Sequence, residues 1–358
     1  MAGVTDPDLA EIARRATIAA RRTHPDAEVA GLRRLPGGVS SLTYAAVLSA
    51  EGAERPIVVK VAPPGLAPVR NRDVLRQAWA LKRLALLDGF PVPAVEFEDA
   101  GDPPETPPLF AMELVAGESY EAALDVSDTP PSPEVAAERM RVAARALARL
   151  QSRSPADLGF GDEAAMPVAE ELDRWERLFA TVDADIAPGH EKLYARLAEA
   201  VPAGIDPRVL HGDYRVANMQ FDGTTLGAVI DWEIWSVGDP RSDLAWLLMH
   251  TAPPQVFHEE RSAADRAAGS QLPTSDELLA TYLDERRRLG ATDGELTAVA
   301  ADLSWFLAVC YYKTASTIAV IHKRDRKRDR PDPGITTGAR HLPEVLEGGH
   351  RLLDAVSS

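Results

Sequence analysis

The chain has 358 residues, and its 55 acidic and 39 basic side chains give a formal net charge of −16 at pH 7. Hydrophobic residues make up 45% and charged residues 26%, a composition that excludes a wholly disordered chain. The negative charge disfavours general binding to nucleic acids or anionic membranes, because their phosphates would be repelled. The length predicts two domains or lobes.

The sequence carries no sign of export or of a membrane anchor. The single cysteine, Cys310, cannot form a disulfide within the chain, which is typical of the reducing cytosol. Because Cys310 lies in an apolar segment, we expect a buried and unreactive thiol. The N-terminus lacks the apolar core of a signal peptide. Lys313 interrupts the most apolar stretch, 303–321, which predicts a buried helix rather than a membrane span. A cytoplasmic protein is therefore expected.

The first 115 residues predict a small mixed lobe. Asp6 and Pro7 indicate the start of a helix that runs to about residue 22, with Asp as the cap and Pro at the first helical position. Strand patterns follow at 28–35, 39–49 and 56–61, and Pro36-Gly37-Gly38 is typical of a hairpin turn. Apolar residues at helical spacing then predict a helix from 74 to about 88, followed by two strands. Those two strands are expected at 92–97 and 109–115.

Residues 116–358 predict a larger helical lobe. Helical patterns cover 132–151, 168–181, 191–200, 239–250, 275–289, 294–321 and 342–356. The segment 209–231 holds only short apolar pieces, broken by polar residues and glycine. The expected fold class is α+β, with a β-rich N-terminal lobe over 1–115 and an α-helical C-terminal lobe over 116–358.

The most informative segment begins at His211 and contains Asp213 and Asn218, with Asp231 thirteen residues after Asn218. Phosphoryl transfer to an alcohol needs a carboxylate that accepts the hydroxyl proton, and oxygen ligands that hold Mg²⁺ on the nucleotide phosphates. The spacing His-x-Asp-x₄-Asn, followed by a further Asp, meets the template of a kinase catalytic loop. It predicts Asp213 as the base and Asn218 and Asp231 as metal ligands.

The passage from His211 to Asp231-Trp232-Glu233, and on through Gly238-Asp239-Pro240 to Asp243, resembles the aminoglycoside phosphotransferase-like kinases. It is most similar to the branch fused to acyl-CoA dehydrogenases, and the resemblance covers residues 35–250. It implies a protein-kinase-like fold with two lobes, ATP with Mg²⁺ as the phosphoryl donor, and a small-molecule hydroxyl as the acceptor. It also implies structural roles for Asp243, which would tie down the catalytic loop, and for His211.

Two upstream features fit a site for the nucleotide phosphates. The glycines and serines after the first strand would let backbone amides and hydroxyls approach phosphates, although Pro-Gly-Gly is also an ordinary hairpin turn. Lys60 is flanked by strand residues and would pair with the α- and β-phosphates; the alternative is an exposed strand lysine. The loop residues proposed to contact phosphate are Gly37, Gly38, Ser40 and Ser41.

The strand at 109–115 resembles the one that leads to the hinge between the lobes. Backbone groups from Glu113 to Val115 would meet the adenine edge, and Met112 would lie behind them or fill the core. One position departs from the family pattern, because the helix that follows Lys60 carries Gln77 where a glutamate is usual. Gln77 offers Lys60 an oxygen but no charge. Asp73, one turn earlier on the same helix face, is the alternative partner.

Arg215, two residues after the predicted base, is a candidate for contact with the acceptor. Four residues near the second metal ligand are further candidates, each equally compatible with packing: Trp232, Glu233, Trp235 and Arg241. The basic run 323–330 holds six Lys or Arg against two Asp. Such runs are usually solvated, and the alternative is that the run binds a phosphorylated substrate. The preferred acceptor is a metabolic alcohol such as a hydroxyacyl-CoA. The alternatives are an aminoglycoside, which the net negative charge would attract, and a pseudokinase that binds nucleotide and regulates a partner.

Overall fold

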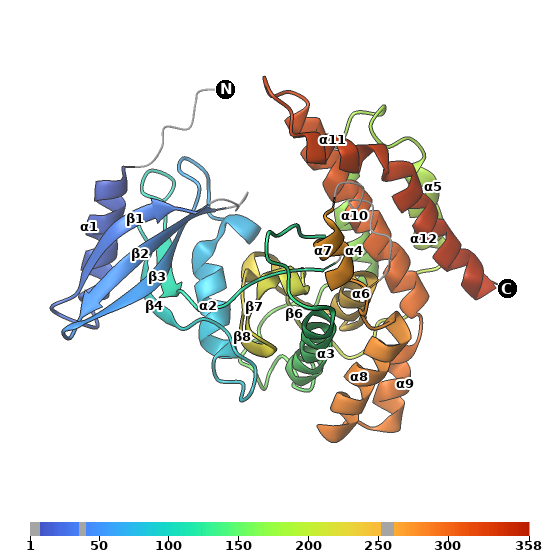
Figure 1. Ribbon diagram of the computed structural model, residues 1–358, viewed down its shortest axis with the longest axis horizontal. Helices are drawn as coiled ribbons and strands as arrows, with labels where there is room; N and C mark the ends of the chain where they lie inside the picture. Colours follow the sequence, from blue (N-terminus) through green and yellow to red (C-terminus); the bar gives the residue numbers. More distant parts are fainter. Residues whose placement is uncertain (1–7, 36–40, 123, 252–260, 358) are drawn as a thin grey trace. The chain divides into compact units, whose positions relative to one another are not determined.

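The computed structural model describes residues 8–35, 41–122, 124–251 and 261–357, with the helices and strands labelled in Figure 1. The chain divides into two compact units. The first consists of residues 1–118 with the later segments 218–222 and 226–235, and the second contains the remainder. Asn218 and Asp231 therefore belong to the first unit, whereas Asp213 belongs to the second. The lobe boundary expected after residue 115 stays a prediction.

A five-stranded antiparallel sheet forms the centre of the first unit. β3 is its middle strand, and all residues from 57 to 61 are buried, because neighbouring strands and helices cover both faces. Lys60 is thus placed in the interior of the sheet and not on an exposed edge. In the order β1-β2-β3-β5-β4, the strands are β1 (Glu28–Arg34), β2 (Leu42–Ala50), β3 (Ala53–Val61), β5 (Leu109–Glu113) and β4 (Val95–Asp99).

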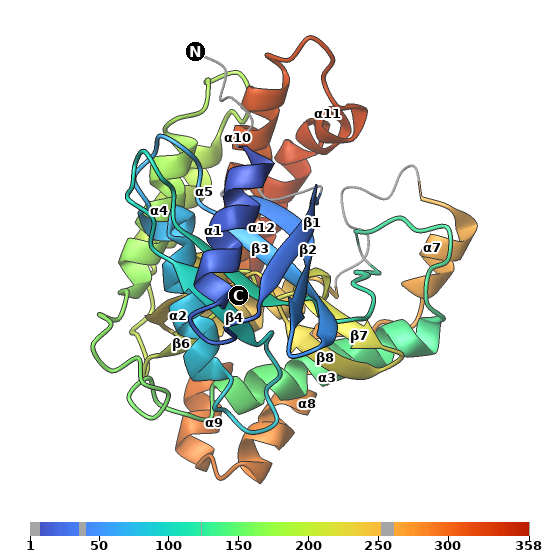
Figure 2. The same cartoon turned by 90° about the vertical axis from the view of Figure 1, so that its left-hand side faces the viewer.

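Two helices complete the predicted order of the first unit. α1 (Leu9–Ala20) packs Ile12 and a row of alanines into the same core as strand residues such as Val29, and Figure 2 shows the helix in front of the sheet. α2 (Val74–Leu84) buries the face that carries Gln77. The remaining pieces are the 3₁₀ helices Arg70–Arg72 and Trp232–Ile234 and the hairpin of β7 (Met219–Asp222) and β8 (Thr225–Val229).

The second unit is mainly helical, and α10 (Leu303–Asp325) passes through an extensive hydrophobic core. Trp305, Phe306 and Tyr312 of α10 share this core with residues of α4, α5, α6 and α12. A short antiparallel pair, β6 (Arg208–Leu210) and β9 (Ser236–Gly238), precedes α6. The other helices are α3 (Pro133–Leu150), α4 (Val168–Phe179), α5 (His190–Glu199), α6 (Arg241–Met249), α7 (Ala263–Ala268), α8 (Ser275–Arg288), α9 (Asp293–Ala300), α11 (Pro333–Arg340) and α12 (Leu342–Ser357), with a 3₁₀ turn at Val216–Asn218.

The single helix predicted over 294–321 is wrong, because the structure has two helices there, α9 and α10. The break lies at Asp302, whose φ of 59° is in the left-handed region. Arg241 contacts the chain at this break: its guanidinium donates to the Ala301 carbonyl and to the Asp302 carboxylate, both at 3.3 Å. In a continuous helix the Ala301 carbonyl would accept the Trp305 amide, but that amide donates to the Asp302 carbonyl and the Ala301 carbonyl accepts from Arg241.

Other differences are small and have local causes. α1 is capped by Asp8, whose carboxylate accepts the Ala10 amide at 2.9 Å, and not by Asp6, which lies outside the described residues. α7 and α11 were not predicted, because charged residues and glycines dilute their apolar pattern. Within the described residues, no helix is long and apolar enough to cross a membrane.

Candidate active site

In the first unit, Lys60 lies between two oxygen acceptors. Its ammonium donates to Gln77 Oε1 at 3.0 Å and to Asp231 Oδ1 at 2.9 Å. Lys60 and Gln77 are buried, at 6% and 2% exposure, whereas the Asp231 side chain is 42% exposed. Removing a lysine from water is costly unless its charge is paired. Asp231 supplies the charge that Gln77 lacks.

The register of α2 decides between the two possible partners of Lys60. Asp73 is the N-cap of the helix, and its carboxylate accepts the backbone N–H of Arg76 at 3.0 Å. An N-cap carboxylate satisfies an amide of the first helical turn, which has no partner within the helix. Asp73 is therefore engaged locally, and Gln77 is the residue of α2 that contacts Lys60.

Asp231 and Asn218 are brought together by the segment that holds the β7–β8 hairpin. The Ile230 amide donates to the Asn218 carbonyl at 2.9 Å, which places the residues before β7 beside those after β8. Asp231 itself has a left-handed backbone, with φ of 62°. A carboxylate and a side-chain amide are oxygen donors that suit Mg²⁺. Among the described residues no group of three His, Cys, Asp or Glu could hold a metal.

The other predicted nucleotide contacts are only partly described. Gly37, Gly38 and Ser40 lie outside the described residues, whereas Ser41 is buried at 3% exposure. Met112 is buried on β5, as packing requires. The Glu113 amide donates to the Ala94 carbonyl at 2.8 Å. Binding of adenine by the segment from Glu113 to Val115 stays a prediction.

In the second unit, Asp243 holds the loop that carries Asp213. The buried carboxylate accepts the backbone amides of His211, at 2.6 Å, and Gly212, at 2.9 Å. Burial raises the pKa of Asp243 above its ordinary value, and the nearby His211 and the two amides oppose that rise. The buried His211 ring uses Nδ1 to accept the Asp213 amide at 3.2 Å. Asp243 and His211 therefore both shape the loop.

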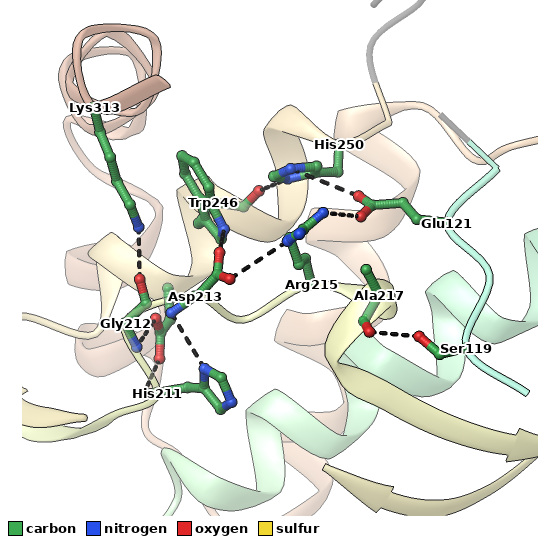
Figure 3. A network of polar contacts seen from close by, with 11 residues as sticks. Ser119, Glu121, His211, Gly212, Asp213, Arg215, Ala217, Trp246, His250 and Lys313 are labelled. Carbon is green, nitrogen blue, oxygen red and sulfur yellow. Dashed lines mark hydrogen bonds and ion pairs between the residues drawn. The ribbon is translucent and has the colours of Figure 1, made fainter. Parts of the chain in front are cut away.

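Figure 3 shows the donors that hold Asp213, whose side chain is nevertheless partly exposed. Its Oδ1 accepts the indole N–H of Trp246 at 2.8 Å, and its Oδ2 lies 3.5 Å from Arg215 Nε. The Asp213 side chain is 30% exposed. Both oxygens thus have a fixed direction, and a hydroxyl from solution has access to the carboxylate. Such an arrangement suits a group that orients an alcohol and accepts its proton.

Three further residues surround this loop and were not among the predicted site residues. Glu121 is buried and pairs with Arg215 at 2.6 Å, and His250 Nε2 lies 3.6 Å from the same carboxylate. Burial alone would lower the pKa of Arg215, but the charges of Glu121 and Asp213 outweigh it and raise that pKa. Lys313 of α10 donates to the Gly212 carbonyl at 2.6 Å. Glu121 is 94 residues from Arg215 in the chain, and Lys313 is 101 residues from Gly212, so no local pattern could indicate these contacts.

For three of the proposed acceptor contacts the structure favours the packing alternative, because their side chains are buried by other contacts. The Trp232 indole donates to the Val229 carbonyl at 3.0 Å. Trp235 stacks on Trp79 with ring centroids 5.4 Å apart. Arg241 is 1% exposed and pairs with Asp239 at 2.7 Å. Arg215 and Glu233 stay predictions.

The basic run, expected to be solvated or to bind a phosphorylated substrate, has ion-pair partners within the chain. Arg326 pairs with Asp183 and with Asp185, the latter at 2.9 Å, and Lys323 lies 3.5 Å from Asp183. Arg328 pairs with Asp325 at 3.3 Å. Half of the six cations are thus engaged by carboxylates of the chain itself.

A family model described as a phosphotransferase enzyme family matches residues 31–282. The chain belongs to this phosphotransferase family. Acyl-CoA dehydrogenase family member 11 from Homo sapiens is 24% identical over 274 residues, which are 75% of this chain but 33% of that protein. The same protein from Gallus gallus is 27% identical over 262 residues, 71% of this chain and 32% of that protein. The chain thus spans about a third of the length of these relatives.

Viomycin phosphotransferase from Streptomyces vinaceus is 31% identical over 185 residues, which cover 47% of this chain and 60% of that protein. Among solved structures, a candidate aminoglycoside phosphotransferase from Ralstonia eutropha matches with a TM-score of 0.69 and 19% identity, over 91% of this chain and 92% of that one. An aminoglycoside phosphotransferase in complex with ADP and hygromycin B matches with a TM-score of 0.55 and 13% identity, over 90% and 95%. These likenesses confirm the predicted two-lobed α+β fold of the family.

Proposed function

We propose that this phosphotransferase moves the γ-phosphoryl group of ATP to a hydroxyl of a small molecule, with Asp213 as the residue that orients the hydroxyl and accepts its proton. The observation that carries the proposal is the state of Asp213: a partly exposed carboxylate whose two oxygens are fixed by Trp246 and Arg215. The loop around it is held by the buried Asp243. Positioning of this kind supplies much of the catalysis of phosphoryl transfer.

In the first unit, we assign Asn218 and Asp231 to Mg²⁺ and Lys60 to the nucleotide phosphates. Bound Mg²⁺ would neutralise charge on the phosphates as the transfer proceeds. The pairing of Lys60 with Asp231 supports this assignment, because Asp231 is exposed enough to take a metal and Lys60 could then pair with phosphate oxygens. Gln77 keeps a hydrogen bond to Lys60 at 3.0 Å, so the lysine is oriented without a glutamate.

For the acceptor we prefer a neutral or anionic metabolic alcohol, such as a hydroxyacyl-CoA. One observation supports this preference. The acyl-CoA dehydrogenase relatives match about three quarters of this chain. The charges at the catalytic loop do not add to it, because Arg215 pairs with the carboxylates of Glu121 and Asp213.

A second candidate is an aminoglycoside or a related antibiotic, which the match to viomycin phosphotransferase favours. The pseudokinase alternative rests on Gln77 alone. ATP turnover with Mg²⁺ separates the three, measured with hydroxyacyl-CoAs and with kanamycin, and with Asp213→Asn as the control for contaminating kinases. Turnover with a hydroxyacyl-CoA that is lost in Asp213→Asn supports the preferred function.

Efficient phosphorylation of kanamycin would overturn the preferred acceptor. ATP binding without turnover of any acceptor would favour the pseudokinase.

The basic run is tested in the same assay by neutralising its six cations. Because Lys323, Arg326 and Arg328 already have partners, we expect the KM for the acceptor to change less than tenfold, a difference of about 1.4 kcal/mol.

A further inference from the structure

We infer that Lys313 is a positioning residue of the phosphoryl transfer, acting on Asp213 through Gly212 and Trp246; this inference rests on the proposed function. Lys313 lies on α10, about 100 residues beyond the catalytic loop in the chain. Figure 3 shows its side chain reaching from α10 to the loop beside Trp246. Both of its polar contacts act on Asp213.

The first contact fixes the backbone of Asp213. The Lys313 ammonium donates to the Gly212 carbonyl at 2.6 Å, and that carbonyl belongs to the peptide bond between Gly212 and Asp213. The N–H of the same peptide donates to His211 Nδ1 at 3.2 Å. A peptide whose oxygen binds a cation becomes a better N–H donor, so the two bonds strengthen each other. The peptide group between Gly212 and Asp213 is thereby fixed at its carbonyl and at its N–H, and it sets the direction of the Asp213 side chain.

The second contact acts on the Asp213 side chain. The Lys313 ammonium lies 3.7 Å from the centroid of the Trp246 ring, and the N–H of that ring donates to Asp213 Oδ1 at 2.8 Å. A cation over the face of an indole is attracted to its π electrons. By drawing electron density from the ring, the cation also makes the N–H a stronger donor. Lys313 thus fixes the indole that orients the carboxylate.

The charge of Lys313 acts on the loop that carries Asp213. The ammonium lies 5.2 Å from the Trp175 ring as well as near Trp246. In the described parts of the chain no carboxylate lies within ion-pair distance of it, and its charge opposes the rise in the pKa of the buried Asp243, which binds the same loop. An apolar side chain of similar length would fill the space between two aromatic rings without the cost of removing a charge from water. A role in packing alone therefore leaves the ammonium unexplained, whereas a role at Gly212 and Trp246 accounts for it.

The decisive variant is Lys313→Met, which keeps the length and the apolar packing but removes the charge and the donor. We expect kcat to fall about 10- to 100-fold, the scale on which a misplaced catalytic group lowers a rate. The KM for ATP should stay within about twofold, because no nucleotide contact is assigned to Lys313. Lys313→Arg keeps a cation and donors and should restore most of kcat. The matched control is Lys192→Met, the same change at an exposed position of α5, which should be silent.

A double-mutant cycle with Trp246→Phe tests the route of the effect. Phe keeps an aromatic face but lacks the N–H that binds Asp213, so the losses of the two single variants should not add in the double variant. Additive losses would overturn the coupling through Trp246. A Lys313→Met enzyme with wild-type kcat, or with a loss that Lys313→Arg does not relieve, would overturn the positioning role.

A crystal structure of Lys313→Met separates this inference from the proposed function. If the wild-type protein turns over no acceptor with Mg²⁺ and ATP, the proposed function fails. The structure of the variant still decides the contact: an Asp213 carboxylate displaced from the Trp246 indole supports the role of Lys313. An Asp213 loop unchanged from that of the wild type overturns it. Thermal melting of both variants shows whether they fold.

Discussion

Two lysines, one in each unit, satisfy their charges in different ways. Lys60 pairs with the partly exposed carboxylate of Asp231, whereas Lys313 meets a backbone carbonyl and the faces of two tryptophans. On the proposed function the Lys60 pair would be exchanged on nucleotide binding, because the metal would bind Asp231 and the phosphates would pair with Lys60. No contact with nucleotide or metal is assigned to Lys313, so its contacts with the chain would stay in place when ATP binds. The first arrangement suits the binding of a charged nucleotide, and the second suits the fixing of a loop.

A third cation, Arg241, pairs with a carboxylate that is itself buried, unlike either lysine. Arg241 is 1% exposed, and its carboxylate partner Asp239 is also buried. Arg241 also donates to the Ala203 carbonyl at 2.7 Å. Since neither charge of this pair is accessible, its role is structural, and its removal should affect stability more than turnover.

The largest expected effect is therefore that of Arg241→Met on folding. Removing one partner of a buried ion pair leaves the other charge without compensation, so the free energy of unfolding should fall by about 3–5 kcal/mol. Urea unfolding measures the change. Asp302→Asn is the control, because Asp302 is 52% exposed and the loss of its contact with Arg241 should cost less than about 1 kcal/mol. A stable Arg241→Met protein with a raised KM for the acceptor would contradict the structural role.

The catalytic carboxylates provide the next test of the comparison. Asp213→Asn should lower turnover at least about 100-fold, the scale of a general base, and leave ATP affinity unchanged. Asp231→Ala should instead lower turnover and the Mg²⁺-dependent affinity for ATP together, because it removes both the proposed metal ligand and the partner of Lys60. Steady-state kinetics and calorimetric titration with ATP separate the two patterns. Near-normal turnover by Asp213→Asn with the acceptor found for the wild type would falsify its assignment.

Much of this site follows from local sequence, because its main motif is short. His211, Asp213, Asn218 and Asp231 lie within 21 residues, and their spacing alone predicts their chemistry. The role of Asp73 also has a local signal, since an aspartate immediately before a helical pattern is a typical N-cap. A carboxylate engaged in this way by its own helix is a poor partner for Lys60, so the signal favours Gln77.

The rest of the site could not be predicted, because tertiary packing supplies it. Trp246 reaches Asp213 across 33 residues, and Glu121 reaches Arg215 across 94. Lys313 stands out as the lysine within the apolar stretch 303–321, but the sequence does not indicate which groups its ammonium contacts. The break before α10 likewise involves a distant residue, Arg241, 60 residues earlier in the chain. Local patterns predict helices, strands and short motifs, but not the contacts of side chains that are distant in the sequence.

A smaller effect is expected at the Lys60 pair. Lys60→Ala should weaken ATP binding about tenfold, or about 1.4 kcal/mol, and leave adenosine binding nearly unchanged, because only phosphate contacts are lost. Gln77→Glu should be tolerated and should increase the affinity for ATP, since it adds the charge that the family usually has.

Asp73→Ala should lower the free energy of unfolding by about 1 kcal/mol through the lost helix cap, with no specific effect on the affinity for ATP. A larger loss of ATP affinity in Asp73→Ala than in Gln77→Ala would reverse this assignment.

The smallest expected signal is at Cys310, which lies one helical turn before Lys313. Burial raises the pKa of the Cys310 thiol to about 12, an effect that the nearby Lys313 charge only partly opposes. Because the thiolate is the reactive form, roughly one thiol in ten thousand would be ionised at pH 8, and the group is also shielded from solvent. A thiol reagent at pH 8 should therefore leave the native protein unlabelled and modify it fully in guanidinium chloride. Rapid labelling of the native protein would show that the core around α10 opens, and the fixed position of Lys313 would then fail with it.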